Sequence, residues 1–213
     1  MVHDAAPGAS GTRGLAGRVA WMVGHSFVFW AERRAAARAQ GHQLGFHRDQ
    51  LAVQWFGYRD FCWGEVCGMV FRMVAGGQRP DLLVLHAGGN DLGLTPQRRL
   101  VKWMKQDLNS LRDLLPGVML VWSEIVPRRR WRHARDPEAI DRCRKKVNSL
   151  MASFVRKLGG VVVRHSELEG GLPGYYRSDG VHLSAVGWDL LTLGWQDGIT
   201  KALCLRGGGA QTV

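Results

Sequence analysis

Short apolar runs alternate along this chain with longer segments whose apolar residues recur every three or four positions. Such short runs are typical of strands buried on both faces, and such longer segments of helices that bury one face. The predicted strands cover residues 19–23, 51–56, 82–86, 118–122 and 161–163. Because helical segments separate them, we expect a three-layer α/β/α sandwich built on a five-stranded parallel sheet.

Cap and turn residues set the limits of the predicted helices. These helices cover residues 27–39, 63–74, 96–115, 137–158 and 185–203. Thr95 before Pro96, and Asp136 before Pro137, have the order of an N-cap followed by proline at the first helical position. Ser184 is predicted to cap the last helix in the same way.

Length and composition indicate one globular domain. The 213 residues, 46% of them hydrophobic, are enough to bury a substantial core. We expect this domain to span residues 15–204, between disordered tails at 1–14 and 205–213. No apolar run reaches the roughly 18–20 residues that cross a bilayer, and the N-terminal segment lacks the order of a secretory signal. We therefore expect no membrane span and a cytoplasmic or nuclear protein that is not secreted.

The four cysteines give no sign of a metal site. No Cys-x-x-Cys pair occurs, and no cysteine has zinc-type spacing to a histidine. We therefore predict neither a metal nor a cofactor, and we interpret the thiols as free cysteines of a reducing compartment. The sequence carries no signal for the oligomeric state.

The net charge of +11 is concentrated in one segment. Residues 128–146 hold nine lysines and arginines against three acids. The net charge of this segment, +6, is over half of the net charge of the chain. A field of this sign attracts phosphates, so one hypothesis is a nucleic-acid-binding surface. Its candidate residues are Arg128, Arg129, Arg130, Trp131 and Arg132, in which the indole would stack on a base. The alternative is an ordinary solvated surface.

Three polar segments mark a candidate catalytic site. Ser26 follows the first predicted strand, Asn90 follows the third, and Asp179 stands three residues before His182 just ahead of the last helix. The carboxyl ends of parallel strands meet at one edge of a sheet, where ligands bind. A carboxylate that holds one imidazole nitrogen leaves the other free to act as a base toward a serine hydroxyl. The pattern indicates one hydrolytic site.

Each of these residues also has a structural interpretation. Ser26 fits the N-cap of the helix that follows it, and Asn90 fits a turn stabilised by its own side chain. Gly57, after the second strand, fits either a turn or an amide donor to an oxyanion. The order Ser, Asp, His also fits the α/β-hydrolases, but Ser26 does not stand in a Gly-x-Ser-x-Gly elbow.

With these motifs, the chain resembles the SGNH hydrolases, also called GDSL esterases and lipases, from about residue 19 to residue 203. The resemblance implies the flavodoxin-like SGNH hydrolase fold and a serine esterase that hydrolyses small acyl esters of the acetyl type. It implies that Ser26, Asp179 and His182 are catalytic, and that Ser26, Gly57 and Asn90 form the oxyanion hole. One residue departs from the family pattern: His25 stands where the family usually has aspartate before the nucleophile.

Two segments resemble a narrower group. Residues 23–30 (VGHSFVFW) and 122–128 (WSEIVPR) are similar to SGNH-like domains carried by some vertebrate retrotransposons. That resemblance keeps a second function open, in which a weakly active or inactive esterase-like domain binds RNA or DNA through its basic surface.

Overall fold

A single five-stranded sheet organises the protein. In the computed structural model, which describes residues 17–207, all strands are parallel and lie in the order β2-β1-β3-β4-β5. The strands are β1 (Arg18–Gly24), β2 (Leu51–Gly57), β3 (Leu82–His86), β4 (Met119–Ser123) and β5 (Val161–Val163). This arrangement confirms the predicted parallel sheet and the place of each strand.

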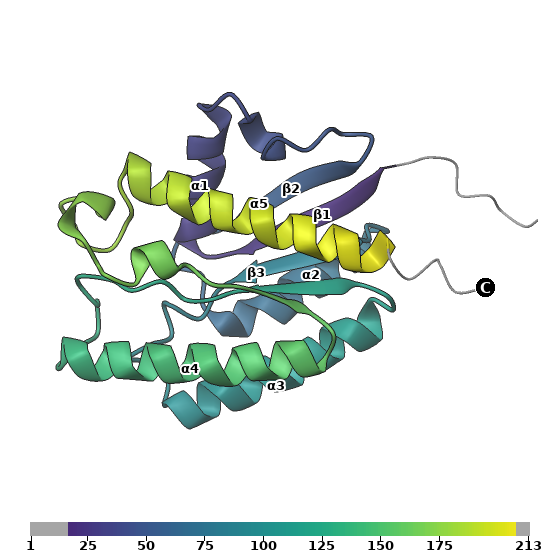
Figure 1. Cartoon of the computed structure of the whole chain (residues 1–213). Coiled ribbons are helices and arrows are strands. Elements are labelled where there is room, and N and C mark those ends of the chain that lie inside the picture. The colour runs from purple at the N-terminus through teal and green to yellow at the C-terminus, as the bar shows by residue number, and fades with distance from the viewer. Residues whose placement is uncertain (1–16, 208–213) are drawn as a thin grey trace, which may run out of the picture.

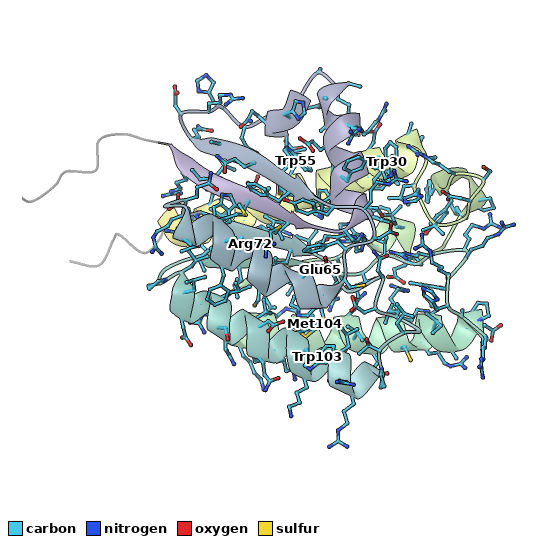
Figure 2. All side chains as sticks on the ribbon, turned by 180° about the vertical axis from the view of Figure 1, so that it is seen from behind. Trp30, Trp55, Glu65, Arg72, Trp103 and Met104 are labelled. Atoms are coloured by element: carbon cyan, nitrogen blue, oxygen red, sulfur yellow. The ribbon has the colours of Figure 1, made fainter. Side chains whose placement is uncertain are left out.

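Helices cover both faces of the sheet, which confirms the three-layer sandwich (Figure 1). The helices are α1 (Ser26–Ala36), α2 (Val66–Ala75), α3 (Gln97–Leu114), α4 (Pro137–Lys157) and α5 (Ala185–Gly207). One hydrophobic core lies between the sheet and α2, α3 and α4, and it includes the fully buried Met104 of α3 (Figure 2). A second core lies between the sheet and α1 and α5. Strand residues are therefore apolar on both sides, as the short runs indicate.

The helix limits differ from the predicted ones in a few places. The first helix ends at Ala36, three residues early, and α2 begins at Val66 after a 3₁₀ turn at Trp63–Glu65. The last helix continues to Gly207, so the tail predicted from residue 205 began too early. The remainder of that tail, and the tail predicted at 1–14, lie outside the described residues.

Two of the three predicted helix caps are confirmed. Asp136 Oδ1 accepts a hydrogen bond from Ala139 N, and Ser184 Oγ accepts one from Gly187 N. The prediction that Thr95 caps α3 was wrong. Pro96 has ψ of 132°, which is extended rather than helical, so the helix starts one residue later and without a side-chain cap.

The carboxyl ends of three neighbouring strands stand level. Gly24 at the end of β1 pairs with Gly57 of β2 on one side and with His86 of β3 on the other. The residues that follow these strands therefore emerge at one edge of the sheet. Within the described residues, no helix is long and apolar enough to cross a membrane.

Candidate active site

Ser26, His182 and Asp179 lie in one hydrogen-bonded line. Ser26 is the first residue of α1, and its Oγ lies 3.3 Å from Nε2 of His182. The other ring nitrogen, Nδ1, lies 2.7 Å from Asp179 Oδ2. An ionised carboxylate only accepts hydrogen bonds, so Nδ1 carries the proton and Nε2 is left to accept one from the serine hydroxyl. The structure brings together the three residues that the sequence placed in two distant segments.

The Asp179 carboxylate is held in its charged form by the loop that carries it. Its Oδ1 accepts hydrogen bonds from the backbone N–H groups of Val181 and His182, at 2.8 and 2.9 Å. Burial alone raises the pKa of Asp179, but hydrogen bonds from the His182 ring and these two amides outweigh it and lower the pKa below its ordinary value. The carboxylate therefore stays ionised beside the imidazole at neutral pH.

His25, not Ser26, caps α1. The Nδ1 atom of His25 accepts a hydrogen bond from Phe27 N at 3.2 Å, so the ring is neutral and carries its proton on Nε2. The side chain is buried, and burial, followed by the nearby His86, Arg128 and His182, holds its pKa well below the ordinary value. The interpretation of Ser26 as an N-cap is thus wrong, because His25 is the N-cap. The Ser26 hydroxyl is therefore free to form a hydrogen bond with His182.

The Asn90 side chain has a defined orientation. Its Nδ2 donates to the carbonyl oxygen of Phe61, and its Oδ1 accepts from Nη2 of Arg128, both at 3.0 Å. A primary amide has two N–H groups, so the second N–H of Nδ2 remains for another acceptor. The neighbouring Asp91 braces the same loop, since its Oδ2 accepts from Trp63 N at 2.9 Å.

Gly57 stands against the first turn of α1. A Cβ atom at this position would come within 2.1 Å of Phe29 N, so close packing of β2 on the helix requires glycine here. Gly57 is not among the residues that line the cavity beside Ser26. Its proposed role as an oxyanion donor stays a prediction.

A cavity of about 170 Å³ opens beside Ser26 and His182. The first residue of α1, the loops after β2, β3 and β4 and the loop before α5 supply its walls: Ser26, Arg59, Asp60, Cys62, Gly89, Asn90, Leu92, Leu94, Arg128, Trp131, Arg132, His133, Val181 and His182. Burial raises the pKa of the Cys62 thiol to about 11, so this cysteine is protonated at neutral pH and is a poor nucleophile. Among residues 17–207, no group of three or more histidine, cysteine or acidic side chains could hold a metal ion.

The basic segment 128–146 is not one open surface. Trp131 is only 7% exposed and packs in the core, so its indole is not presented for stacking on a nucleic-acid base. Arg128 is partly buried and turns into the cavity, and Arg132 is exposed but paired with Asp60 at 2.9 Å. Of the five residues predicted to bind nucleic acid, Arg129 and Arg130 are left exposed and without a carboxylate partner among the described residues.

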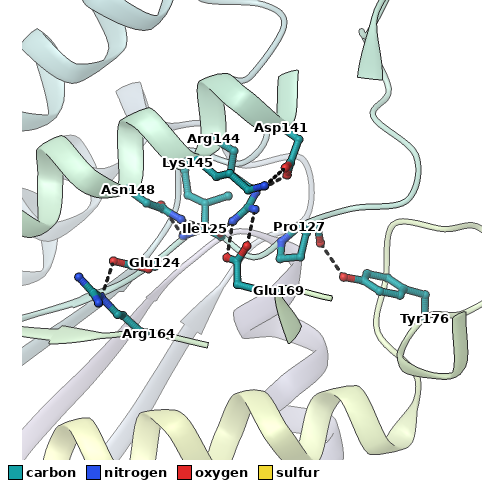
Figure 3. Close-up of polar contacts among 10 residues, drawn as sticks. All are labelled: Glu124, Ile125, Pro127, Asp141, Arg144, Lys145, Asn148, Arg164, Glu169 and Tyr176. Carbon is teal, nitrogen blue, oxygen red and sulfur yellow. Dashed lines mark hydrogen bonds and ion pairs between the residues drawn. The ribbon is translucent and has the colours of Figure 1, made fainter. Parts of the chain in front are cut away.

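Arg144 of the same segment is a structural residue. It is fully buried, and its guanidinium donates to Glu169, Asp141 and the backbone oxygen of Ile125 (Figure 3). Its charge is neutralised inside the protein and cannot attract phosphate at the surface.

A second serine–histidine cluster lies inside the core. Ser123 Oγ is 2.8 Å from His86 Nδ1 and 2.8 Å from His165 Nε2, and it accepts a hydrogen bond from Trp195 Nε1. Ser123 is 0% exposed, and no carboxylate contacts either imidazole among the described residues. We interpret this cluster as a polar network of the core, in which the buried His86 Nε2 has no hydrogen-bond partner among the described residues, because substrate cannot reach the Ser123 hydroxyl.

The inward position of Arg128 is what the sequence analysis missed. Arg128 lies five residues beyond the end of β4, at the same sheet edge as Ser26 and Asn90. The rule that ligands bind beyond the carboxyl ends of parallel strands therefore applied to it as well. Its neighbours in a run of arginines hid that signal.

Comparisons with known proteins identify the family and agree with the fold. A family model described as GDSL-like Lipase/Acylhydrolase family matches residues 8–190. A solved GDSL-like lipase from Bacteroides thetaiotaomicron is 16% identical, with a TM-score of 0.68 over 91% of this chain and 92% of that one. A family 3 carbohydrate esterase from Clostridium thermocellum is 18% identical, with a TM-score of 0.66 over 88% and 97%.

An acetylxylan esterase from Geobacillus stearothermophilus, solved as a catalytic mutant, is 12% identical, with a TM-score of 0.63 over 86% of this chain and 94% of that one. At such identities these likenesses concern the fold. No curated protein sequence matches the chain.

Proposed function

The chain belongs to the GDSL-like lipase/acylhydrolase family, and from this premise we propose that it is a serine esterase acting on small acyl esters. Ser26 is the nucleophile, His182 the general base and acid, and Asp179 the residue that orients the imidazole. The observation that carries the proposal is the hydrogen-bonded line from Ser26 Oγ through His182 to Asp179 at the wall of a cavity.

Acylation begins with the serine hydroxyl. Ser26 Oγ attacks the ester carbonyl carbon while His182 Nε2 takes its proton, and the imidazolium that forms is stabilised by Asp179. The bond from the carbonyl carbon to the alcohol oxygen then breaks. His182 gives its proton to that oxygen, so the alcohol leaves neutral and the acyl group stays on Ser26.

Hydrolysis of the acyl-enzyme repeats these steps with water. His182 takes a proton from the water, whose oxygen attacks the acyl carbon, and then returns the proton to Ser26 Oγ. The products are the free acid and the starting enzyme. No metal or redox partner takes part in this balance.

We expect three donors to stabilise the negative oxygen of the tetrahedral intermediates. They are the backbone amide of Ser26, the backbone amide of Gly57 and the free N–H of Asn90. The hydrogen bonds of Asn90 to Phe61 and Arg128 support this role, because they fix which side of the amide group is the nitrogen and which is the oxygen. The amide of Ser26 lies at the N-terminal end of α1, where the helix dipole favours negative charge.

The size of the cavity supports a short acyl group. About 170 Å³ is below the roughly 300–1,000 Å³ typical of pockets for drug-sized ligands. We therefore propose acetyl-type esters rather than long-chain lipids as substrates.

Turnover of a chromogenic acetyl ester tests the proposal. The purified protein should hydrolyse 4-nitrophenyl acetate, and Ser26→Ala should reduce the rate to that of buffer. Ser110→Ala, on the exposed side of α3, is the matched control and should retain full activity. Equal rates for the protein and Ser26→Ala would refute the proposal.

Binding of nucleic acid, within a protein of retrotransposon origin, is a second candidate function. Its support is a hollow whose lining includes Arg129, Arg130 and Arg177 and no carboxylate. Affinity for RNA or DNA should then fall steeply with salt, and joint replacement of Arg129 and Arg130 by glutamine should abolish it. Binding that survives this replacement would remove the hollow as the site.

A further inference from the structure

Arg128 carries a positive charge that the protein does not neutralise. Among residues 17–207 no carboxylate lies within ion-pair distance of its guanidinium, whose one hydrogen bond goes to the neutral Asn90 amide. Burial, and then the charge of Arg132, lower the pKa of Arg128 to about 10, so the group remains protonated at neutral pH. The rings of Phe27 and Trp131, whose centroids lie 5.4 and 5.2 Å from its guanidinium carbon, offset part of the cost of burying this cation but carry no negative charge, so a ligand can still supply the counterion.

This charge lies at the proposed catalytic site. Arg128 lines the same cavity as Ser26 and His182. Its Nη2 is used by Asn90 Oδ1 at 3.0 Å, which leaves other N–H groups of the five-donor fork for a ligand. A group bound by Arg128 would therefore belong to the same molecule whose carbonyl lies beside Ser26.

The segment that carries Arg128 is firmly held. Asn148 Oδ1 accepts from Ile125 N at 2.9 Å, and both Asn148 and Arg144 donate to Ile125 O. Two residues further on, the carbonyl oxygen of Pro127 accepts from the hydroxyl of Tyr176 at 3.0 Å (Figure 3). Arg128 follows directly, so its backbone is fixed before any ligand arrives.

The other charged groups around the cavity do not cancel Arg128. Asp60 is occupied by Arg132, and Arg59 adds a further positive charge at the wall. Behind the cavity, His25 is neutral, because its Nδ1 accepts a hydrogen bond from a backbone amide. The carboxylate of Asp179 is held by His182 and two backbone amides. The lining is therefore net positive.

We propose that the substrate of this enzyme is an anionic ester, and that Arg128 binds a carboxylate or phosphate group carried by it. The inference rests on the proposed esterase function and adds the substrate class to it. A guanidinium binds the oxygens of either group through parallel, charge-assisted hydrogen bonds, which a neutral ester cannot offer. The neutral acetates of a general esterase assay are then poor analogues of the natural substrate.

Matched ester pairs test this selectivity in turnover. On the acyl side, mono-4-nitrophenyl succinate is compared with its methyl ester, and on the alcohol side 4-acetoxybenzoate is compared with its methyl ester. We expect kcat/KM to favour the anionic member of at least one pair by about tenfold or more, the size of one charge-assisted hydrogen bond. The pair that shows the preference identifies the side of the ester that faces Arg128. No preference in either pair would overturn the inference.

Substitution separates charge recognition from the support of Asn90. Arg128→Gln should lose the preference for the anionic ester, while Arg135→Gln, an exposed arginine seven residues later that lines no described cavity, should keep it. Loss of Asn90 support alone would lower kcat equally for both members of a pair and leave their ratio unchanged. An unchanged ratio in Arg128→Gln would contradict the proposal.

A binding measurement separates this inference from the esterase proposal. Two proteins are compared by titration calorimetry: Ser26→Ala, and Ser26→Ala that also carries Arg128→Gln. For each protein, the dissociation constants of mono-4-nitrophenyl succinate and of its methyl ester are measured. Tighter binding of the anion, lost in Arg128→Gln, supports the subsite whether or not the wild type hydrolyses the ester. Equal affinity for both compounds overturns the subsite, even if the wild type hydrolyses 4-nitrophenyl acetate.

Discussion

The two ring nitrogens of His25 have different surroundings, which define its work at the residue scale. Nδ1 accepts the Phe27 amide and so caps α1, while Nε2 is buried and has no hydrogen-bond partner among the described residues. An aspartate at this position would offer a carboxylate oxygen to accept the same Phe27 amide. The departure from the family pattern therefore preserves the cap that presents Ser26, and it removes a negative charge from the surroundings of Arg128.

Replacement of His25 should test that capping role. His25→Ala should lower the free energy of unfolding by about 1–2 kcal/mol or more, because an N-cap and a buried ring are both lost. His25→Asn keeps an oxygen that can accept the Phe27 amide, so it should recover part of the loss. Urea unfolding measures both values. Equal stability of the two variants would show that the cap contributes nothing.

Asn90 is the residue whose predicted role depends most on side-chain geometry. Asn90→Ala should lower kcat by roughly 10²–10³, because an oxyanion donor is removed, and should change KM much less. Steady-state hydrolysis of 4-nitrophenyl acetate measures both constants. Asn109→Ala, on an exposed position of α3, is the control and should behave like wild type. A loss confined to KM would contradict an oxyanion role.

At the scale of elements, Arg144 connects α4 to the segment after β4. Its Nη atoms donate to both Glu169 oxygens at 2.7 Å, its Nε donates to Asp141, and it holds Ile125 O. This helix thus positions the segment that delivers Arg128 to the cavity. The packing of α4 therefore affects the position of Arg128 in the cavity.

Removal of this guanidinium should be costly. Arg144→Ala should lower the free energy of unfolding by about 3 kcal/mol, since it empties a fully buried position, breaks the ion pairs to Asp141 and Glu169, and removes one of the two side-chain hydrogen bonds to Ile125 O. Arg142→Ala, two residues earlier on the same helix, removes only exposed ion pairs and should cost under about 1 kcal/mol. Similar losses measured by urea unfolding would show that Arg144 is not a structural link.

Strands and helix caps show how far the sequence determines the elements. All five strands were predictable, because runs such as residues 82–86 are apolar, short and bounded by turns. The cap at Asp136 was predictable from its chemistry, whereas Thr95 has the same chemistry and fails, because Pro96 adopts an extended ψ. Such choices depend on the tertiary path of the loop, which local sequence does not contain.

The candidate site was predictable where a combination of residue types is typical of catalysis. Asp179 and His182 form one short motif, and strand order carries Ser26 to the same edge. By contrast, Trp131 and Arg128 stand in a run of arginines, and such a run predicts an exposed surface segment. Their burial follows from the clamp on Ile125 and Pro127, made by residues up to 49 positions away.

At the scale of the whole molecule, three buried histidines affect stability against acid. Burial holds the pKa of His25 and His86 well below the ordinary value of 6.5, and lowers that of His165 to about 3. Below pH 6.5 these imidazoles bind protons in the unfolded chain but stay unprotonated in the folded protein. Their contribution is therefore complete above pH 6.5 and is lost as the pH falls toward the folded values. Asp91, whose pKa burial raises to about 6, opposes this trend with one group.

The free energy of unfolding should consequently fall between about pH 7 and about pH 5. His165→Gln should make this fall shallower, because one of these imidazoles is removed. Urea titrations at several pH values give the slope. A free energy that is constant across this range would contradict the burial of neutral imidazoles.

The central claim concerns the whole fold, because Ser26 is activated only if α1 and the loop before α5 meet. A fluorophosphonate probe reacts with an activated serine hydroxyl, and mass spectrometry identifies the labelled residue. We predict rapid labelling at Ser26 in the wild type, and labelling slowed by orders of magnitude in His182→Ala. Labelling of Ser26 at the same rate in His182→Ala, or no labelling of Ser26 in the wild type, would contradict the account.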